Sequence, residues 1–358
     1  MGLLSPTLSQ VSVLATSSVE RVALGVGWVN VEPYPNVFDT NVLAQLRNAI
    51  SFVQSKGMQV SLDLGLHYPP SWVFSLSGQT RFINQYGDVW HGAASEDVPN
   101  AVFNPAVRAA EVDYIAHVAD AINPSTVASV RVGGLLSGEL RYPINNYNGH
   151  TMSLWMYDPA AQAKAPYAGW RPGSGTTTVA RASLAYYFGS LTAYETWLMK
   201  TVNANFPDVD QQIMFPSWGL RPGVVDSAVA AGLHNTTGAE INGAISEGLE
   251  WVSQVKAITT AGVNGTVYCT WVDAPSQGST VQQVPPVQYL ASLAAAYGLP
   301  VAGENTGGGG KAALNLTMQR ATANHLTGVM YMSGNLIDNG SAGISLAELK
   351  AGALAFTG

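Results

Sequence analysis

The sequence predicts an α/β fold, a (β/α)8 TIM barrel in which eight parallel strands alternate with helices. Short apolar segments alternate with helix-like segments almost throughout the 358 residues. The apolar segments are hydrophobic at most positions, as expected for strands buried on both faces of a parallel sheet. Seven such segments can be identified, one fewer than a closed eight-stranded barrel requires.

The seven predicted strands are followed by helix-like segments or loops, and they lie in residues 19–33, 58–72, 127–139, 211–218, 265–273, 299–305 and 327–335. The eighth strand should precede the helix-like segment 5–18, where only the four residues MGLL remain. The first strand is therefore expected to be short or missing. Residues 1–358 are expected to form one catalytic domain, because the glycine run 307–310 is too short for an interdomain linker.

Two helices carry clear start signals. Asp39 precedes one of them as a capping residue, and Asn104 precedes the other, with Pro105 at the first helical position. A third helix is expected near 181–204. Apolar residues recur at helical spacing after both caps and predict one buried stripe on each helix, formed by Leu43, Leu46, Ile50 and Val53 in the first and by Val112, Ile115, Val118 and Ile122 in the second.

Composition excludes several classes of protein. The net charge of −7 and the scattered basic residues argue against nucleic-acid binding, and no apolar run is long enough to span a membrane. Charged residues make up only 11%, which suits a secreted protein of an acidic or hot habitat, although compositional drift gives the same pattern. We expect an extracellular location, although no signal peptide is recognised. No metal or cofactor is expected, since the six histidines lack metal-ligand spacing, and Cys269 in an apolar run reads as a core residue.

Carboxylates, aromatic rings and neutral hydrogen-bonding groups gather where the predicted strands end. The carboxyl ends of barrel strands form the active-site face of this fold. Sugars offer C–H faces for stacking and hydroxyls for hydrogen bonds, and two carboxylates cleave the glycosidic bond. The candidate catalytic residues are Glu139 and Glu304, and the candidate substrate-binding residues are Trp28, Asp63, His67, Arg141, Tyr142, Trp218, Trp271, Asp273, Asn305 and Tyr331.

Short motifs resemble two groups of (β/α)8 glycoside hydrolases. GELRYP (138–143), VAGEN (301–305) and LTGVMYMSGNLI (326–337) resemble segments of β-amylases. GWVNVEPYPNVFD (27–39), HYPPSWV (67–73) and LWMYDPAAQ (154–162) resemble segments of (β/α)8 β-galactosidases, which belong to the retaining β-glycosidase clan. Residues 74–100 and 144–180 resemble neither group.

The resemblance implies that Glu139 is the catalytic acid. In β-amylases the second catalytic glutamate follows a Cys-Leu pair, whereas this chain has Cys269, Thr270 and then Trp271. The β-amylase base is therefore missing. In the retaining clan the nucleophile ends the seventh strand, which points to Glu304, with a structural role as its alternative. Asp273 is the alternative candidate for the second catalytic carboxylate, as the base that activates water in an inverting enzyme.

Three functions remain open from the sequence. The favoured one is a retaining hydrolase that cleaves β-glycosidic bonds in an oligo- or polysaccharide. The alternatives are an inverting β-amylase-like α-glucan hydrolase and a non-catalytic carbohydrate-binding barrel. Arg141 is expected to hold a catalytic carboxylate ionised unless it faces solvent. For the other binding candidates, a role in the core competes with a role in sugar binding.

Overall fold

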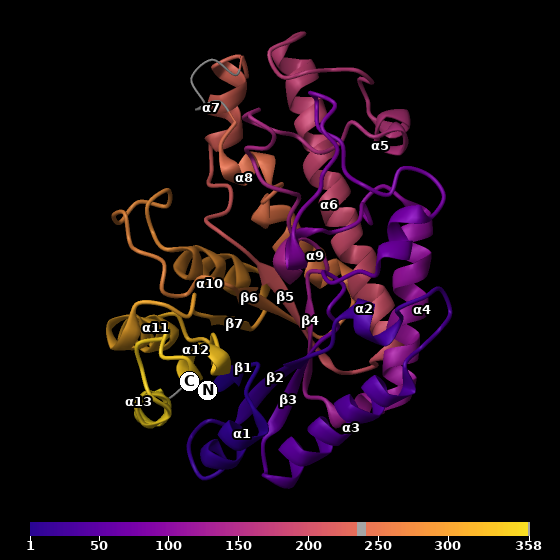
Figure 1. Cartoon of the computed structure of the whole chain (residues 1–358). Coiled ribbons are helices and arrows are strands. Elements are labelled where there is room, and N and C mark those ends of the chain that lie inside the picture. The colour runs from indigo at the N-terminus through magenta and orange to yellow at the C-terminus, as the bar shows by residue number, and fades with distance from the viewer. Residues whose placement is uncertain (235–240, 357–358) are drawn as a thin grey trace.

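The computed structural model describes residues 1–234 and 241–356 and confirms the predicted fold. Eight strands pair in parallel, each with its neighbours in sequence, and close into a barrel (Figure 1). The strands are β1 (Gly2–Leu4), β2 (Arg21–Gly25), β3 (Gln59–Asp63), β4 (Ser129–Val132), β5 (Asp210–Phe215), β6 (Gly265–Cys269), β7 (Val301–Glu304) and β8 (Gly328–Tyr331).

The strand that the sequence left in doubt is present but short. β1 has three residues. It pairs with β2 on one side, and on the other side Gly2 and Leu3 pair with Met330 and Tyr331 of β8. The prediction of a short first strand is therefore confirmed, and this strand closes the ring.

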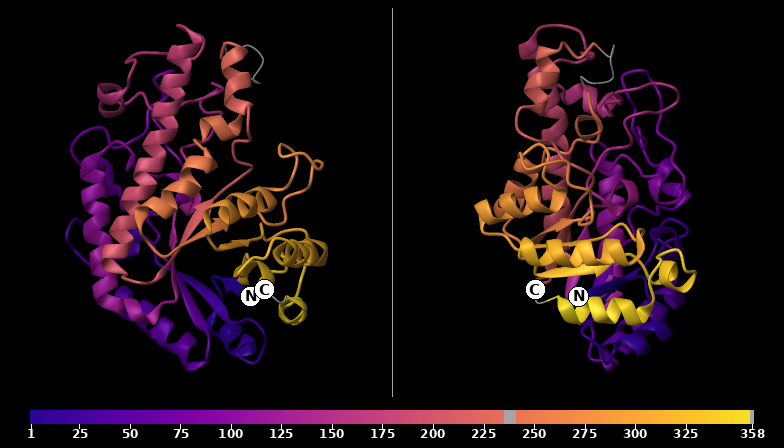
Figure 2. Two further views of the ribbon diagram at one scale, coloured as in Figure 1. Left: turned by 180° about the vertical axis from the view of Figure 1, so that it is seen from behind. Right: turned by 90° about the vertical axis from the view of Figure 1, so that its left-hand side faces the viewer.

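Helices cover the outside of the barrel (Figure 2). None of the helices in residues 1–234 and 241–356 combines the length and the hydropathy that a membrane span requires. The helices are α1 (Leu8–Leu14), α2 (Trp28–Val31), α3 (Thr40–Ser55), α4 (Pro105–Ile122), α5 (Pro159–Lys164), α6 (Thr177–Asn205), α7 (Val224–Ala230), α8 (Gly243–Ser246), α9 (Trp251–Ala261), α10 (Pro286–Tyr297), α11 (Gly310–Ala323), α12 (Gly334–Asp338) and α13 (Leu346–Ala355).

The two predicted caps are confirmed. The carboxylate of Asp39 accepts hydrogen bonds from the first-turn amides of α3, and the side-chain oxygen of Asn104 does the same for α4. The predicted stripe of α3 is buried throughout. In α4 the prediction for Val112 is wrong, because this side chain is 40% exposed and Glu111 takes the buried position. The buried row of α4 follows from Val107 at four-residue spacing, so Val112 lies one position out of phase.

All seven predicted strands are shorter than expected, as β2 and β4 illustrate. β2 ends at Gly25, and Trp28 lies in the short helix α2. β4 ends at Val132, and the chain then folds back through a 3-10 turn before it reaches Glu139. A Cβ atom at Gly133 would lie 2.3 Å from the carbonyl oxygen of Gly138, so only glycine permits this close return.

Inside the barrel, the strands on the β3–β5 side contribute polar side chains. Ser129 donates a hydrogen bond to Ser61 at 2.8 Å, and Ser61 donates one to Gln212 at 2.8 Å. The other strands contribute mainly apolar side chains, and Ala23, Tyr268, Ala302 and Met330 form a small core together with Met214 of β5. The alternation along each strand sends the next residues outward, into the large core between the sheet and the helices.

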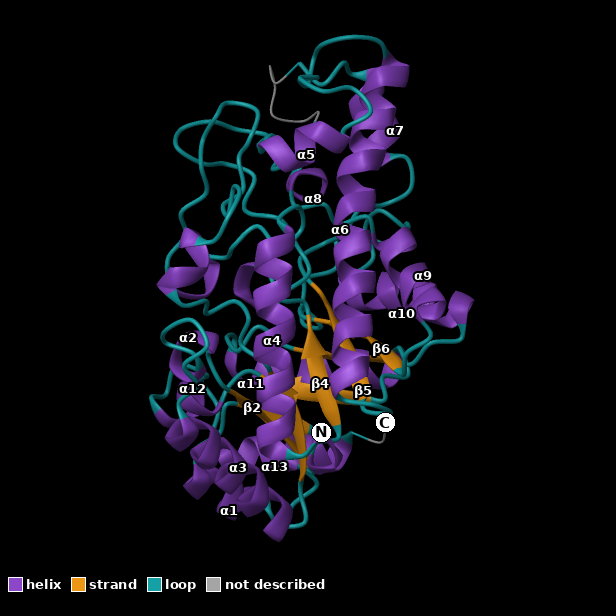
Figure 3. Cartoon of the chain, turned by 90° about the vertical axis from the view of Figure 1, so that its right-hand side faces the viewer, coloured by secondary structure: helices purple, strands orange, loops and turns teal. Residues whose placement is uncertain are grey.

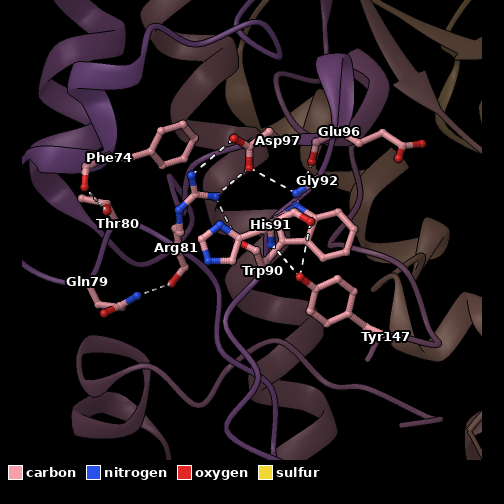
Figure 4. A network of polar contacts seen from close by, with 10 residues as sticks. All are labelled: Phe74, Gln79, Thr80, Arg81, Trp90, His91, Gly92, Glu96, Asp97 and Tyr147. Atoms are coloured by element: carbon pink, nitrogen blue, oxygen red, sulfur yellow. Dashed lines mark hydrogen bonds and ion pairs between the residues drawn. The ribbon is translucent and has the colours of Figure 1, made fainter. Parts of the chain in front are cut away.

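Long connections on one side of the barrel build the upper part of the molecule. They follow β3, β4 and β5, carry α5, α7 and α8, and rise beside the upper end of α6 (Figure 3). The connection after β3 is fixed by Arg81, which pairs with Asp97 at 2.6 Å and stacks on Phe74 (Figure 4). The backbone amide of His91 donates to the hydroxyl of Tyr147 at 3.0 Å, so the connections after β3 and β4 are joined.

Candidate active site

A buried cation and two carboxylates form the top layer of the barrel interior. Side chains of a strand alternate between the two faces of the sheet, and this alternation turns Asp63 of β3, Arg131 of β4 and Glu304 of β7 inward. The Nη2 atom of Arg131 donates to Oε2 of Glu304 at 2.8 Å, and its Nε atom lies 3.8 Å from Oδ2 of Asp63. Tyr268 of β6 donates its hydroxyl to the same oxygen of Glu304 at 3.0 Å.

Arg131 stays charged in this layer. Burial lowers its pKa, but Glu304, Tyr268 and Asp63 together outweigh burial and raise the pKa above its usual value. A buried guanidinium at hydrogen-bond distance stabilises the ionised form of a carboxylate. Glu304 therefore lies at the end of β7 between a cation and a phenol, which both donate to the same oxygen.

Glu139 lies at the same end of the barrel in a different environment. Oε1 of Glu139 accepts a hydrogen bond from Oγ1 of Thr270 at 2.7 Å, and Oε2 lies 3.0 Å from Nε of Arg141. Burial raises the pKa of Glu139, Arg141 and Thr270 lower it, and the charges of Glu304 and Glu247 raise it further. The net result is a pKa above the usual value, as a group that must donate a proton requires.

His67 packs directly against the turn that carries Glu139. A Cβ atom at Gly138 would lie 2.8 Å from Cε1 of the His67 ring, and Gly138 has a φ of +79°, so glycine is required there. Burial lowers the pKa of His67, while Asp63 raises it and Arg131 lowers it. The imidazole is thus held neutral at pH values where a free histidine is partly charged.

A pocket of about 500 Å³ opens beside these groups, at the carboxyl ends of β1, β2 and β3. Its polar lining includes Asp63, His67 and Arg131, together with Asn30 and the exposed ring of Tyr68. Neither Glu139 nor Glu304 lines it, but Arg131 contacts Glu304 directly. Arg131 therefore links the lining of the pocket to the carboxylate of Glu304.

Two of the predicted aromatic residues, Trp218 and Trp271, lie at the ends of β5 and β6, away from the pocket at β1–β3. Trp218, which follows β5, and Trp271, which follows β6, are both half-buried, with their ring centroids 6.3 Å apart in an edge-to-face arrangement. Asp273 is held by the loop after β7, because Thr306 donates its amide and its hydroxyl to the two carboxylate oxygens at 3.0 Å. Both oxygens of Asp273 thus have a structural partner.

Four of the predicted substrate-binding residues are buried in the structure. Trp28 is fully buried and donates to Glu32 within the α2 turn. Tyr142 is fully buried and donates to the carbonyl of Tyr187. Tyr331 turns into the outer core, because its neighbour on β8 takes the inward position. Asn305 accepts a hydrogen bond from the amide of Met332 and so fixes β7 to β8.

Four residues of the site were missed by the sequence analysis, namely Arg131, Tyr268, Thr270 and Glu247. A usable signal existed for Arg131, since a charged side chain within an apolar strand must find a buried partner. Tyr268 carries a similar but weaker signal as a polar ring within an apolar run. Nothing in the sequence around Glu247 distinguishes it from a surface glutamate. Within residues 1–234 and 241–356, no three His, Cys, Asp or Glu side chains are arranged to hold a metal ion.

Comparison with solved structures confirms the resemblance at the level of the fold. The chain is similar to the catalytic domain of β-amylase from Paenibacillus polymyxa, with a TM-score of 0.71 and 18% identity over 98% of this chain and 96% of that one. It is also similar to β-galactosidases from Halorubrum lacusprofundi and Marinomonas ef1, with TM-scores of 0.63 and 0.60 and identities of 16% and 12%. The chain covers 99% of its own length in both cases but only 57% and 58% of theirs.

Sequence comparison adds no relative to these structural neighbours. No protein-family model matches the chain, and no curated protein matches its sequence. The functional assignment therefore rests on the two glutamates and the residues that contact them.

Proposed function

We propose that this protein is a retaining glycoside hydrolase that cleaves β-glycosidic bonds, with Glu139 as the acid and Glu304 as the nucleophile. The observation that carries the proposal is the contrast between their surroundings. Glu304 lies against the buried cation Arg131, whereas the pKa of Glu139 is raised by burial and by neighbouring carboxylates. A carboxyl group with a raised pKa and a second one paired with a cation form the arrangement that glycosidic cleavage requires.

The reaction follows from these two states. The protonated carboxyl of Glu139 gives its proton to the glycosidic oxygen as the bond from that oxygen to the anomeric carbon breaks. A carboxylate oxygen of Glu304 bonds to the anomeric carbon, and the leaving sugar departs as a neutral alcohol. Glu139, now a carboxylate, takes a proton from water, and the resulting hydroxide displaces Glu304 and restores the original configuration.

The mouth of the barrel offers sugar-binding surfaces on both sides of this pair. The pocket at β1–β3 combines the exposed ring of Tyr68 with Asp63, His67 and Asn30. The half-buried rings of Trp218 and Trp271 lie at the ends of β5 and β6. Aromatic faces suit the C–H faces of sugars, and the charged and amide groups suit their hydroxyls.

An inverting β-amylase-like activity is the second candidate, supported by the structural likeness over nearly the whole length of both chains. It needs a base that activates water on the far side of the sugar. Asp273 has both oxygens engaged by Thr306. This observation favours Glu304 over Asp273 as the second carboxyl group of the site.

A panel of aryl glycosides of several sugars, each in both anomeric forms, tests the proposal. We expect turnover of β-glycosides, with the first-formed sugar product in the β-configuration by proton NMR. Turnover of α-maltosides alone, with β-products, would show inversion and overturn the proposal in favour of the second candidate. Turnover of none, with binding of oligosaccharides retained in calorimetry, would indicate a carbohydrate-binding barrel.

A further inference from the structure

Glu247, which directly follows α8, shares a cation with the proposed acid. The Nη1 atom of Arg141 lies 3.3 Å from Oε2 of Glu247, and the Nε atom of Arg141 lies 3.0 Å from Oε2 of Glu139. The three side chains are only 13–18% exposed, so their charges interact through a poorly screened medium. One guanidinium thus joins two carboxyl groups that come from the connections after β4 and β5.

The position of Glu247 is fixed by its backbone. The amide of Tyr142 donates to the carbonyl of Glu247 at 3.0 Å. The hydroxyl of Tyr187 on α6 donates to the preceding carbonyl, that of Ser246. A Cβ atom at Gly248 would lie 2.7 Å from the ring of Tyr142, so the glycine allows this segment to approach the site closely. Glu247 is therefore held in place next to Arg141.

Carboxyl groups outnumber cations around the proposed acid. Two guanidiniums, those of Arg131 and Arg141, lie here and in the adjoining top layer of the barrel, together with four carboxyls, those of Asp63, Glu139, Glu247 and Glu304. The other titratable groups that interact with these residues or pack against the turn include His67, Tyr187, Tyr268 and Cys269. Since Arg131 serves Glu304 and Asp63, Arg141 alone is left for Glu139 and Glu247. A cluster with this imbalance retains a proton more readily than a matched pair does.

We propose that Glu247 is a positioning residue, which takes up part of the charge of Arg141 so that Glu139 keeps the proton that it delivers to the glycosidic oxygen. This inference rests on the proposed function of Glu139. Without the carboxylate of Glu247, Arg141 pairs with Glu139 alone and holds it ionised. The enzyme then loses its protonated acid at a lower pH.

The variant Glu247→Gln tests this, because it removes the charge and keeps the shape. The alkaline limb of the kcat/KM profile on a β-glycoside with a poor leaving group should move down by about one pH unit, while kcat below the limb stays within a few-fold of the parent value. Glu247→Asp, which keeps the charge, should leave the limb nearer to that of the parent. Glu111→Gln removes another buried carboxyl, on α4, and should not move the limb.

A second measurement does not depend on turnover. The carboxyl carbon of Glu139, identified in 13C-labelled protein by its absence in Glu139→Gln, should titrate at a lower pH in Glu247→Gln than in the parent. A uniform loss of rate with an unmoved limb and an unmoved titration would overturn the inference and leave Glu247 a structural residue. A parent protein that cleaves no glycoside would overturn the proposed function instead, and the titration would still test the charge sharing.

Discussion

Glu139 and Glu304 face the same mouth of the barrel, but different parts of the molecule hold them. Glu304 ends β7, and its partners Arg131 and Tyr268 lie within β4 and β6. Glu139 follows a turn after β4, and its partners Thr270 and Arg141 lie beyond the strands. The register of the barrel therefore positions one carboxyl group, and the packing of the connections positions the other.

The difference also separates the two chemical roles. The group built into the barrel, Glu304, lies against a buried cation, which suits the role of a nucleophile. The group carried by connections, Glu139, has its pKa raised first by burial and then by the charges of neighbouring carboxylates, which allows it to carry a proton. Substitutions around Glu304 and substitutions around Glu139 are thus expected to change different properties of the enzyme.

Removing the nucleophile should have the largest effect. Glu304→Gln keeps an oxygen that accepts from Arg131 and Tyr268 but loses the attacking carboxylate, so kcat should fall on the order of 10⁴-fold or more. The loss should be similar for all leaving groups, as measured with a series of aryl β-glycosides. Asp273→Asn serves as the control and should keep most of the activity. A larger loss in the control than in Glu304→Gln would assign the second role to Asp273.

Removing the acid should have an effect that depends on the leaving group. Glu139→Gln should lower kcat/KM by about 10²–10⁴-fold for substrates with poor leaving groups, because their oxygen needs a proton in the transition state. Activated aryl glycosides need little protonation and should lose far less. The slope of log(kcat/KM) against the pKa of the leaving group measures the difference. An equal loss across the series would remove Glu139 from the role of acid.

Breaking the buried pair should cost stability as well as activity. Arg131→Met leaves Glu304 buried without its cation, which should lower the free energy of unfolding by about 3–5 kcal/mol. Urea denaturation measures this loss. The double variant Arg131→Met with Glu304→Gln removes both charges and should recover part of the stability. If the double variant is no more stable than the single one, the pair contributes little to the barrel.

The smallest expected effect concerns Thr270. Its hydroxyl donates to Glu139 and lowers the pKa of that carboxyl, so Thr270→Val should raise it. Activity that needs protonated Glu139 is present below this pKa and is lost as the pH rises through it. The alkaline limb should therefore move upward by up to about one pH unit in a kcat/KM profile, opposite in direction to Glu247→Gln. A downward movement would contradict the assignment of that limb to Glu139.

The parent optimum itself is expected to be acidic, below about pH 6.

The sequence located both glutamates but only one of their environments. The motif that ends in Tyr142 and Pro143 placed Arg141 two residues after Glu139, and this ion pair is present at 3.0 Å. The partner of Glu304 lies 173 residues away in the chain. A charged residue at position 131 indicated a buried partner, but no local pattern could identify it. The pairing of Arg131 with Glu304 could therefore not be predicted from the sequence, although both residues can be read from it.

The burial of the aromatic candidates could not be predicted from the sequence either. Trp28, Tyr142 and Tyr331 lie in segments that suit a sugar-binding site, yet all three are fully buried. Trp218 and Trp271 also lie at the ends of predicted strands, but they are half-buried. The side of the sheet that a ring faces depends on where each strand ends, and strand ends are the least certain part of a pattern-based prediction.

The sequence by itself determined the barrel, the caps of α3 and α4 and the two glutamates, because periodicity, capping and short motifs are local properties. Only the tertiary structure decided that Arg131 pairs with Glu304 and that Arg141 is shared with Glu247, 106 residues away. Such contacts form when the ring closes in one register and the connections after β4 and β5 pack on each other. The protonation states of the site depend on those contacts, and so they follow from the folded arrangement.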